Sequence, residues 1–112
     1  MIRPALVVAI FLTGSPALAD EVLTDITDAA RGAFVAVKGE VTRIFDEDTF
    51  RLTDATGSIR VYIGPNRMPV RDGDSVTVEG QVDDDLIGPR EIYADALVLE
   101  DGTAVTLSRR YD

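Results

Sequence analysis

The sequence predicts an all-β domain, a five-stranded Greek-key barrel, and three observations support this prediction. After residue 34 apolar and polar residues alternate over most of the chain, which is the period of a strand with one buried face. Turn-forming clusters rich in Asp, Gly and Pro separate the alternating segments at short intervals. Two of these segments contain a glycine, at Gly39 and Gly80, which suits the sharp coiling of strands in a small barrel.

The first 19 residues predict a secretory signal peptide that is not part of the fold. Met1-Ile2-Arg3 is a short basic region, residues 5–12 are apolar, and Ala17-Leu18-Ala19 supplies a small-x-small cleavage pattern before Asp20. The alternative is a membrane anchor, but an apolar run of roughly 8 to 12 residues is shorter than the ~20 that a spanning helix needs. We therefore expect a periplasmic protein that is not embedded in the membrane.

Residues 20–33 are expected to form a short helical lead-in. Val22, Leu23, Ile26 and Ala29 follow helical spacing, and Gly32 could end the helix.

The alternation then predicts five strands, at residues 34–45, 49–53, 58–63, 75–82 and 91–99. A change of parity after Gly39 indicates a bulge or bend in the long first strand. Residues 54–57 form a four-residue hairpin loop, and 64–73 form a connector rich in Gly and Pro. The barrel domain is expected to span 34–100, and a polar tail, 101–112, could add a short strand at 103–107.

A long bent first strand and a break between the third and fourth strands match the OB-fold, a five-stranded Greek-key barrel. An open meander or a small sandwich would show similar strand spacing, and these remain the alternatives.

Four segments resemble a known family: 37–41 (VKGEV), 46–50 (DEDTF), 54–61 (DATGSIRV) and 73–83 (GDSVTVEGQVD). In this order they are similar to the bacterial OB-fold (BOF) family of periplasmic stress-tolerance proteins, the YgiW/YdeI type. The resemblance covers residues 34–99. It implies a periplasmic OB barrel without established catalysis that is associated with tolerance to peroxide, acid, metals or cationic peptides.

Composition excludes several classes of function. The 112 residues include 20 Asp and Glu against 11 Lys and Arg, a formal charge of −9, with no His and no Cys. Without these side chains there is no Ser-His-Asp triad, no thiol nucleophile and no imidazole metal ligand. No enzymatic activity is therefore expected. Duplex nucleic acid is disfavoured because it needs basic surface, whereas the acidic balance favours a cationic partner.

Two acidic loops form the first candidate site. In an OB barrel the loops after the first and fourth strands flank the same face, and here they carry Asp46, Asp48, Asp83, Asp84 and Asp85. Carboxylates at one rim would bind Ca²⁺ or another cation, a basic peptide or a polyamine. Solvated turn-forming residues are the plainer explanation. No other cofactor is expected.

A row of arginines forms the second candidate site. Pairing Phe45 with Thr49, and Thr53 with Ser58, places Arg43, Arg51 and Arg60 opposite one another on the outer face, with Phe45 and Tyr62 in the next row. Like charges in that position need compensation. An anionic or sugar-like ligand would supply it, and so would ion pairs with neighbouring carboxylates.

These observations predict a periplasmic binding module of envelope stress tolerance that holds a cationic ligand at the acidic rim. The alternatives are an anionic or glycan ligand on the arginine face, and docking of an envelope protein through an edge strand. A monomer is expected.

Overall fold

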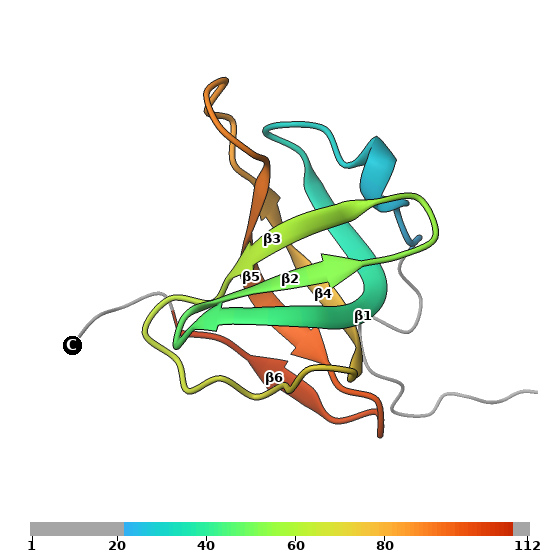
Figure 1. Cartoon of the computed structure of the whole chain (residues 1–112), viewed down its shortest axis with the longest axis vertical. Helices are drawn as coiled ribbons and strands as arrows, with labels where there is room; N and C mark the ends of the chain where they lie inside the picture. The colour runs from blue at the N-terminus through green and yellow to red at the C-terminus, as the bar shows by residue number, and fades with distance from the viewer. Residues whose placement is uncertain (1–21, 109–112) are drawn as a thin grey trace, which may run out of the picture.

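One continuous sheet closes into a barrel in the computed structural model, which describes residues 22–108 (Figure 1). Its strands are β1 (Phe34–Asp46), β2 (Thr49–Thr53), β3 (Ser58–Tyr62), β4 (Ser75–Val82), β5 (Glu91–Val98) and β6 (Ala104–Thr106). They lie in the order β3-β2-β1-β4-β5-β6, and an added parallel pairing of β3 with β5 closes the barrel. That closure confirms the OB-fold prediction and excludes the open meander and the sandwich.

The long β1 serves two neighbours because it bends. Residues 34–40 pair with β4, and residues 40–46 pair with β2. The parity change predicted near Gly39 occurs at Thr42, which bulges between the pairs Val41–Leu52 and Arg43–Arg51. The bulge turns position 43 outward although position 41 faces inward, because one extra residue reverses the alternation of a strand.

Apolar side chains of the inward-facing positions fill the barrel. Phe50, Leu52, Val61, Ile92 and Leu97 are fully buried. Ile44, Phe50 and Val61 share this interior, as the register predicted from the sequence requires, with Ile44 partly buried against the core. The inward set fixes which residues point outward, since successive side chains of a strand face opposite sides.

The lead-in differs from the predicted helix. Within its described part only one 3-10 turn forms, η3 (Ile26–Asp28). Tertiary hydrogen bonds occupy the backbone instead: the Asp54 carboxylate accepts from Ile26 N at 2.9 Å, and Arg90 Nη1 donates to the carbonyls of Ile26 and Ala29 at 2.8 and 2.6 Å. These bonds place Ile26 in the core, where it is fully buried. The predicted signal peptide lies outside the described residues.

The tail contributes a strand, which answers a question that the sequence left open. β6 pairs antiparallel with β5, and Leu107 is buried in the core. Asn66 of the connector ties the tail to the barrel through Ser108 N, which donates to Asn66 Oδ1 at 2.9 Å. Between residues 22 and 108 no helix has the length and apolarity that crossing a membrane requires.

Candidate functional site

Three arginines line up across the outer face of β1, β2 and β3, as the sequence predicted. Arg43 pairs with Arg51, and Arg51 pairs with Arg60. Arg51 is half-buried, and its Nε donates to Thr42 Oγ1 at 3.0 Å. The bulge at Thr42 therefore has two effects: it turns Arg43 to this face and supplies the hydroxyl that orients Arg51.

Phe45 joins the row through a second bulge. The sequence paired it with Thr49, but Asp46 pairs with Thr49 and Phe45 is the extra residue. The guanidinium carbons of Arg43 and Arg60 lie 5.2 and 4.7 Å from the centre of the Phe45 ring, within the range of cation–π attraction. Phe45 thus holds two cationic groups close together at the middle of the face.

A cleft of about 300 Å³ opens beside this ring. We name it the arginine cleft, and it is lined by Phe45, Arg51, Ser58, Ile59, Arg60, Pro89 and Arg90. Its lining combines three guanidinium-bearing residues with apolar surface and includes no carboxylate. Arg90 was not anticipated from the sequence, because only the folded chain brings the end of the β4–β5 loop (residues 83–90) over β3.

One carboxylate lies beside the arginine row: Glu91 is the Cα partner of Arg60. No ion pair is described for Arg43, Arg51 and Arg60 among residues 22–108, and the charge of Glu91 acts on Arg60 at one end of the row. Burial raises the pKa of Glu91, and the nearby charge of Arg60 opposes that rise. Three like charges therefore remain on one face, an arrangement that costs stability unless an anion is bound.

The acidic loops take a different form from the one predicted. Among residues 22–108 no three carboxylates are grouped so that they could hold a metal ion. Two of the loop aspartates accept hydrogen bonds from backbone N–H groups of their own turns instead. Asp46 accepts from Asp48 N and Asp83 accepts from Asp85 N, each at 3.1 Å. The calcium site considered from the sequence is therefore not built by these residues.

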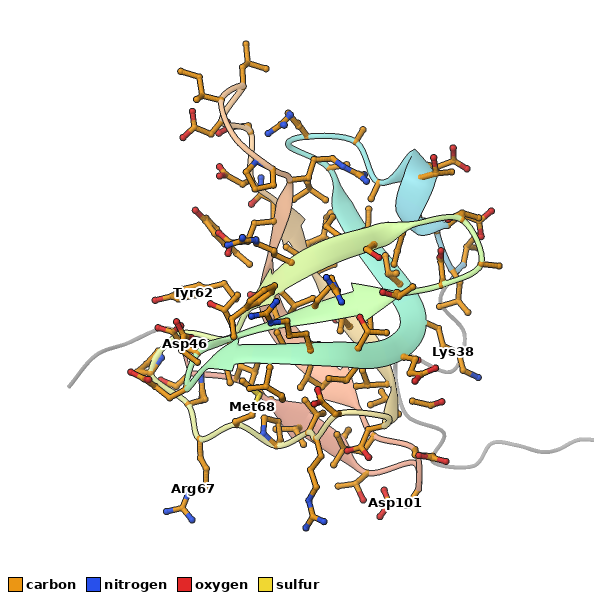
Figure 2. The ribbon with its side chains drawn as sticks, in the orientation of Figure 1. Lys38, Asp46, Tyr62, Arg67, Met68 and Asp101 are labelled. Atoms are coloured by element: carbon orange, nitrogen blue, oxygen red, sulfur yellow. The ribbon has the colours of Figure 1, made fainter. Side chains whose placement is uncertain are left out.

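Within the β1–β2 turn the two aspartates differ in acidity. Hydrogen bonds from Asp48, first from its backbone and then from its side chain, lower the pKa of Asp46. The hydrogen bond shared with Asp46 raises the pKa of Asp48. Figure 2 shows Asp46 at the same end of the barrel as Tyr62, in line with the pairing of Thr49 with both residues.

Glu91 interacts electrostatically with one aspartate of each acidic loop, Asp48 and Asp83. The sequence analysis did not predict this residue as part of a site. Burial raises its pKa most, and the charges of Asp83 and Asp48 raise it further against the lowering by Arg60. The available signal was its place as the first residue of the fifth strand, directly after the acidic loop. A negative potential is therefore concentrated here, next to the arginine row.

Tyr62 lies at the edge of the face, outside the lining of the arginine cleft. It pairs with Tyr93 across β3 and β5, and the two rings meet edge to face with centroids 5.8 Å apart. With Gly64 and Pro65 they line a small pocket of about 110 Å³. Of the five residues predicted for this face, Arg43, Phe45, Arg51 and Arg60 come together, whereas Tyr62 belongs to a neighbouring tyrosine pair.

Comparison with known proteins agrees with this architecture. Residues 16–99 match the family model described as "Bacterial OB fold (BOF) protein". Among solved structures, the hypothetical protein ygiW from E. coli is similar, with a TM-score of 0.60 and 22% sequence identity over 80% of this chain and 99% of that chain. The search of curated proteins found no match. At this identity the structural likeness shows the fold alone.

Proposed function

Since the chain belongs to the bacterial OB-fold (BOF) family, we propose that it is a periplasmic binding module of envelope stress tolerance that holds an anionic ligand on its β1–β2–β3 face. The export pattern of residues 1–19 supports the location. The module acts by binding rather than turnover, since the sequence offers no imidazole or thiol for catalysis.

The observation that carries this proposal is the row of Arg43, Arg51 and Arg60 on one face of the sheet. Three guanidinium groups share one face with a single neighbouring carboxylate described, that of Glu91, and two of the three are held against Phe45. An anion would relieve their mutual repulsion and accept hydrogen bonds from the planar guanidinium donors. The sequence placed the cationic-ligand hypothesis first, and the geometry favours this alternative.

The cleft also indicates the class of ligand. Its volume of about 300 Å³ is at the lower end of the range for small-molecule sites. Its apolar lining from Phe45, Ile59 and Pro89 offers a ring face beside the cationic groups. A sugar that bears a carboxylate, phosphate or sulfate group fits this combination, because OB barrels use this face for oligosaccharides and the arginines require negative charge.

The test is a binding titration with two matched probes, a sulfated tetrasaccharide and the same tetrasaccharide without sulfate. We expect only the sulfated probe to raise the melting temperature, since a ligand of the native state stabilises by mass action. Replacing Arg51 and Arg60 by Ala should weaken its affinity by about tenfold or more, because each charge-assisted hydrogen bond is worth about 1.5–3 kcal/mol.

Arg67→Ala with Arg71→Ala is the matched control, since it removes the same charge from exposed connector residues. Figure 2 shows Arg67 projecting from the connector, away from Tyr62. Equal losses in both double variants would mean that the probe senses net charge only and would contradict the proposed face.

A second candidate function rests on Glu91. The carboxylates of Asp48 and Asp83 both act on it, so a cationic group of a polyamine or a basic peptide would be attracted to this rim. Spermidine in the same melting experiment tests this candidate. A shift with spermidine that survives Arg51→Ala and Arg60→Ala would place the cationic ligand at the acidic rim, as the sequence suggested.

A further inference from the structure

The β4–β5 loop ends in two apolar side chains that contact almost nothing in their own chain. Leu86 and Ile87 are 84% and 85% exposed. In Figure 1 this loop projects beyond the barrel at the top of the view. We call these two residues the tip. Exposed apolar side chains that adjoin one another can form a patch for interaction with a partner.

The tip is held in place from both sides. Arg31 of the lead-in donates through Nη1 to the carbonyl of Asp85, and through Nη2 to the carbonyl of Gly88 at 2.8 Å. These two carbonyls flank Leu86 and Ile87 in the chain. At the base of the loop, Asp83 N donates to Glu91 O at 2.8 Å. Binding would therefore order little additional backbone, which reduces the entropic cost of association.

The surface that complements this tip is present in the same molecule. The loop carries three consecutive acidic residues directly before the tip, Asp83, Asp84 and Asp85. It therefore combines exposed apolar side chains with negative charge. The arginine cleft presents the reverse, an apolar lining with three arginines and no carboxylate. Both charge and polarity therefore match between the two surfaces.

A chain cannot fill its own cleft with its own tip. Pro89 and Arg90 of the loop line the cleft, while the exposure of Leu86 and Ile87 shows that neither lies in it. Tip and cleft are neighbours in the chain, since only Gly88 separates Ile87 from Pro89 of the cleft lining. A two-fold axis beside them would bring each tip to the other chain's cleft, and such an arrangement closes after two copies.

We propose that two copies of this chain associate by exchanging tips, with Leu86 and Ile87 of each inserted in the arginine cleft of the other. The contact depends on the shape and charge of the cleft and not on the identity of any ligand. An anionic ligand and a second copy would compete for the same cleft, so ligand binding would favour the single chain.

The test is sedimentation velocity on the purified protein as it is isolated from bacteria. The protein concentration is varied from about 1 µM to about 1 mM, the range of dissociation constants of weak complexes. We expect the sedimentation coefficient to rise with concentration to that of a dimer, and added salt to reverse the rise. Two double variants address the two surfaces: Leu86→Ser with Ile87→Ser, and Arg51→Ala with Arg60→Ala. Each should raise the dissociation constant by about tenfold or more.

The most informative experiment measures association in a mixture of these two double variants. One retains its cleft and the other retains its tip, so the mixture can form one tip–cleft contact that neither variant can form alone. We expect the mixture to associate more strongly than either component. Arg67→Ala with Arg71→Ala and the exposed Phe34→Ser are controls for charge and for apolar surface, and both should leave the dissociation constant unchanged.

A single chain at every concentration would overturn the proposal and leave the monomer expected from the sequence. A dimer that neither double variant weakens, or a mixture that associates no better than its components, would overturn it as well. Failure of the proposed function is a separate result. The tip variant keeps the whole arginine cleft, so it should still bind the sulfated probe if that function is correct.

Discussion

At the scale of single residues, Asp54 connects more of the structure than any position that the sequence suggested. Its carboxylate accepts from Ile26 N at 2.9 Å, from Thr56 N and Oγ1 at 2.7 and 2.6 Å, and from Gly57 N at 3.1 Å. It therefore closes the β2–β3 hairpin and fixes the lead-in above it. Burial raises its pKa, but these hydrogen bonds together lower it below the ordinary 3.8.

Asp54→Asn should reduce the free energy of unfolding by about 2 kcal/mol at neutral pH, because the amide nitrogen cannot accept a hydrogen bond from a backbone N–H. Chemical denaturation measures this loss. Asp72→Asn is the control, since Asp72 is exposed and accepts none of the described hydrogen bonds.

The pH dependence of Asp54 has a definite sign. A carboxyl whose folded pKa lies below its unfolded value stabilises the fold fully above the unfolded value. That contribution is lost as the pH falls from about 3.8 through the folded pKa. The stability difference between the wild type and Asp54→Asn should therefore shrink in this acidic range. A difference that stayed constant down to about pH 2 would show that the charge of Asp54 contributes nothing.

At the scale of elements, the close approach of β4 to β5 depends on Gly80. A Cβ there would collide with the carbonyl oxygen of Tyr93 and would lie 2.8 Å from Ala94 Cα. Next to it the register shifts, with Glu79 paired to Ala96 and Gly80 paired to Ala94. The strand that carries Glu91 and Tyr93 to the binding face is positioned by this contact.

Gly80→Ala should lower the free energy of unfolding by about 2–4 kcal/mol, because backbone atoms must move to admit the methyl group. Gly57→Ala is the matched control: a Cβ there meets only Ile26 Cγ2 at an ordinary 3.8 Å, and the cost should be below about 1 kcal/mol. Thermal or chemical denaturation measures the loss of stability in the two variants. Similar losses in both would contradict the prediction, because they would show that the chain admits the methyl group at position 80 without strain.

At the scale of the whole molecule, charge is separated rather than mixed. The formal charge is −9, yet one face collects Arg43, Arg51 and Arg60, with acidic loops at its border. Long-range fields of this kind set the preference between cationic and anionic ligands and depend on salt.

Neutralising Asp83, Asp84 and Asp85 together as Asn should raise the affinity for the sulfated tetrasaccharide by about threefold or more, since repulsion over ~10 Å in water is worth a few tenths of a kcal/mol per charge. The same variant should weaken any binding of spermidine. Isothermal titration at two salt concentrations measures both effects. Gains that persisted unchanged at high salt would point to a structural change of the loop instead.

The sequence by itself determined the class of the fold and much of the register. Alternation with period two predicts which side chains are buried, and together with the two short turns it predicts the registers that set Arg51 between Arg43 and Arg60. The hairpin at 54–57 and the break at 64–73 follow from local turn chemistry, so they were predictable as well. Composition alone excluded histidine- and thiol-dependent chemistry, because the chain contains neither His nor Cys.

Only the tertiary structure decided the features that depend on contacts distant in the chain. The lead-in forms one 3-10 turn because Asp54 and Arg90 bind its backbone, and helical periodicity contains no information about such partners. Closure of β3 on β5 placed Glu91 beside Arg60. It also brought Arg90 to the arginine cleft. The aspartates of the acidic loops accept hydrogen bonds within their own turns, and no group of three carboxylates able to hold a metal ion forms among residues 22–108.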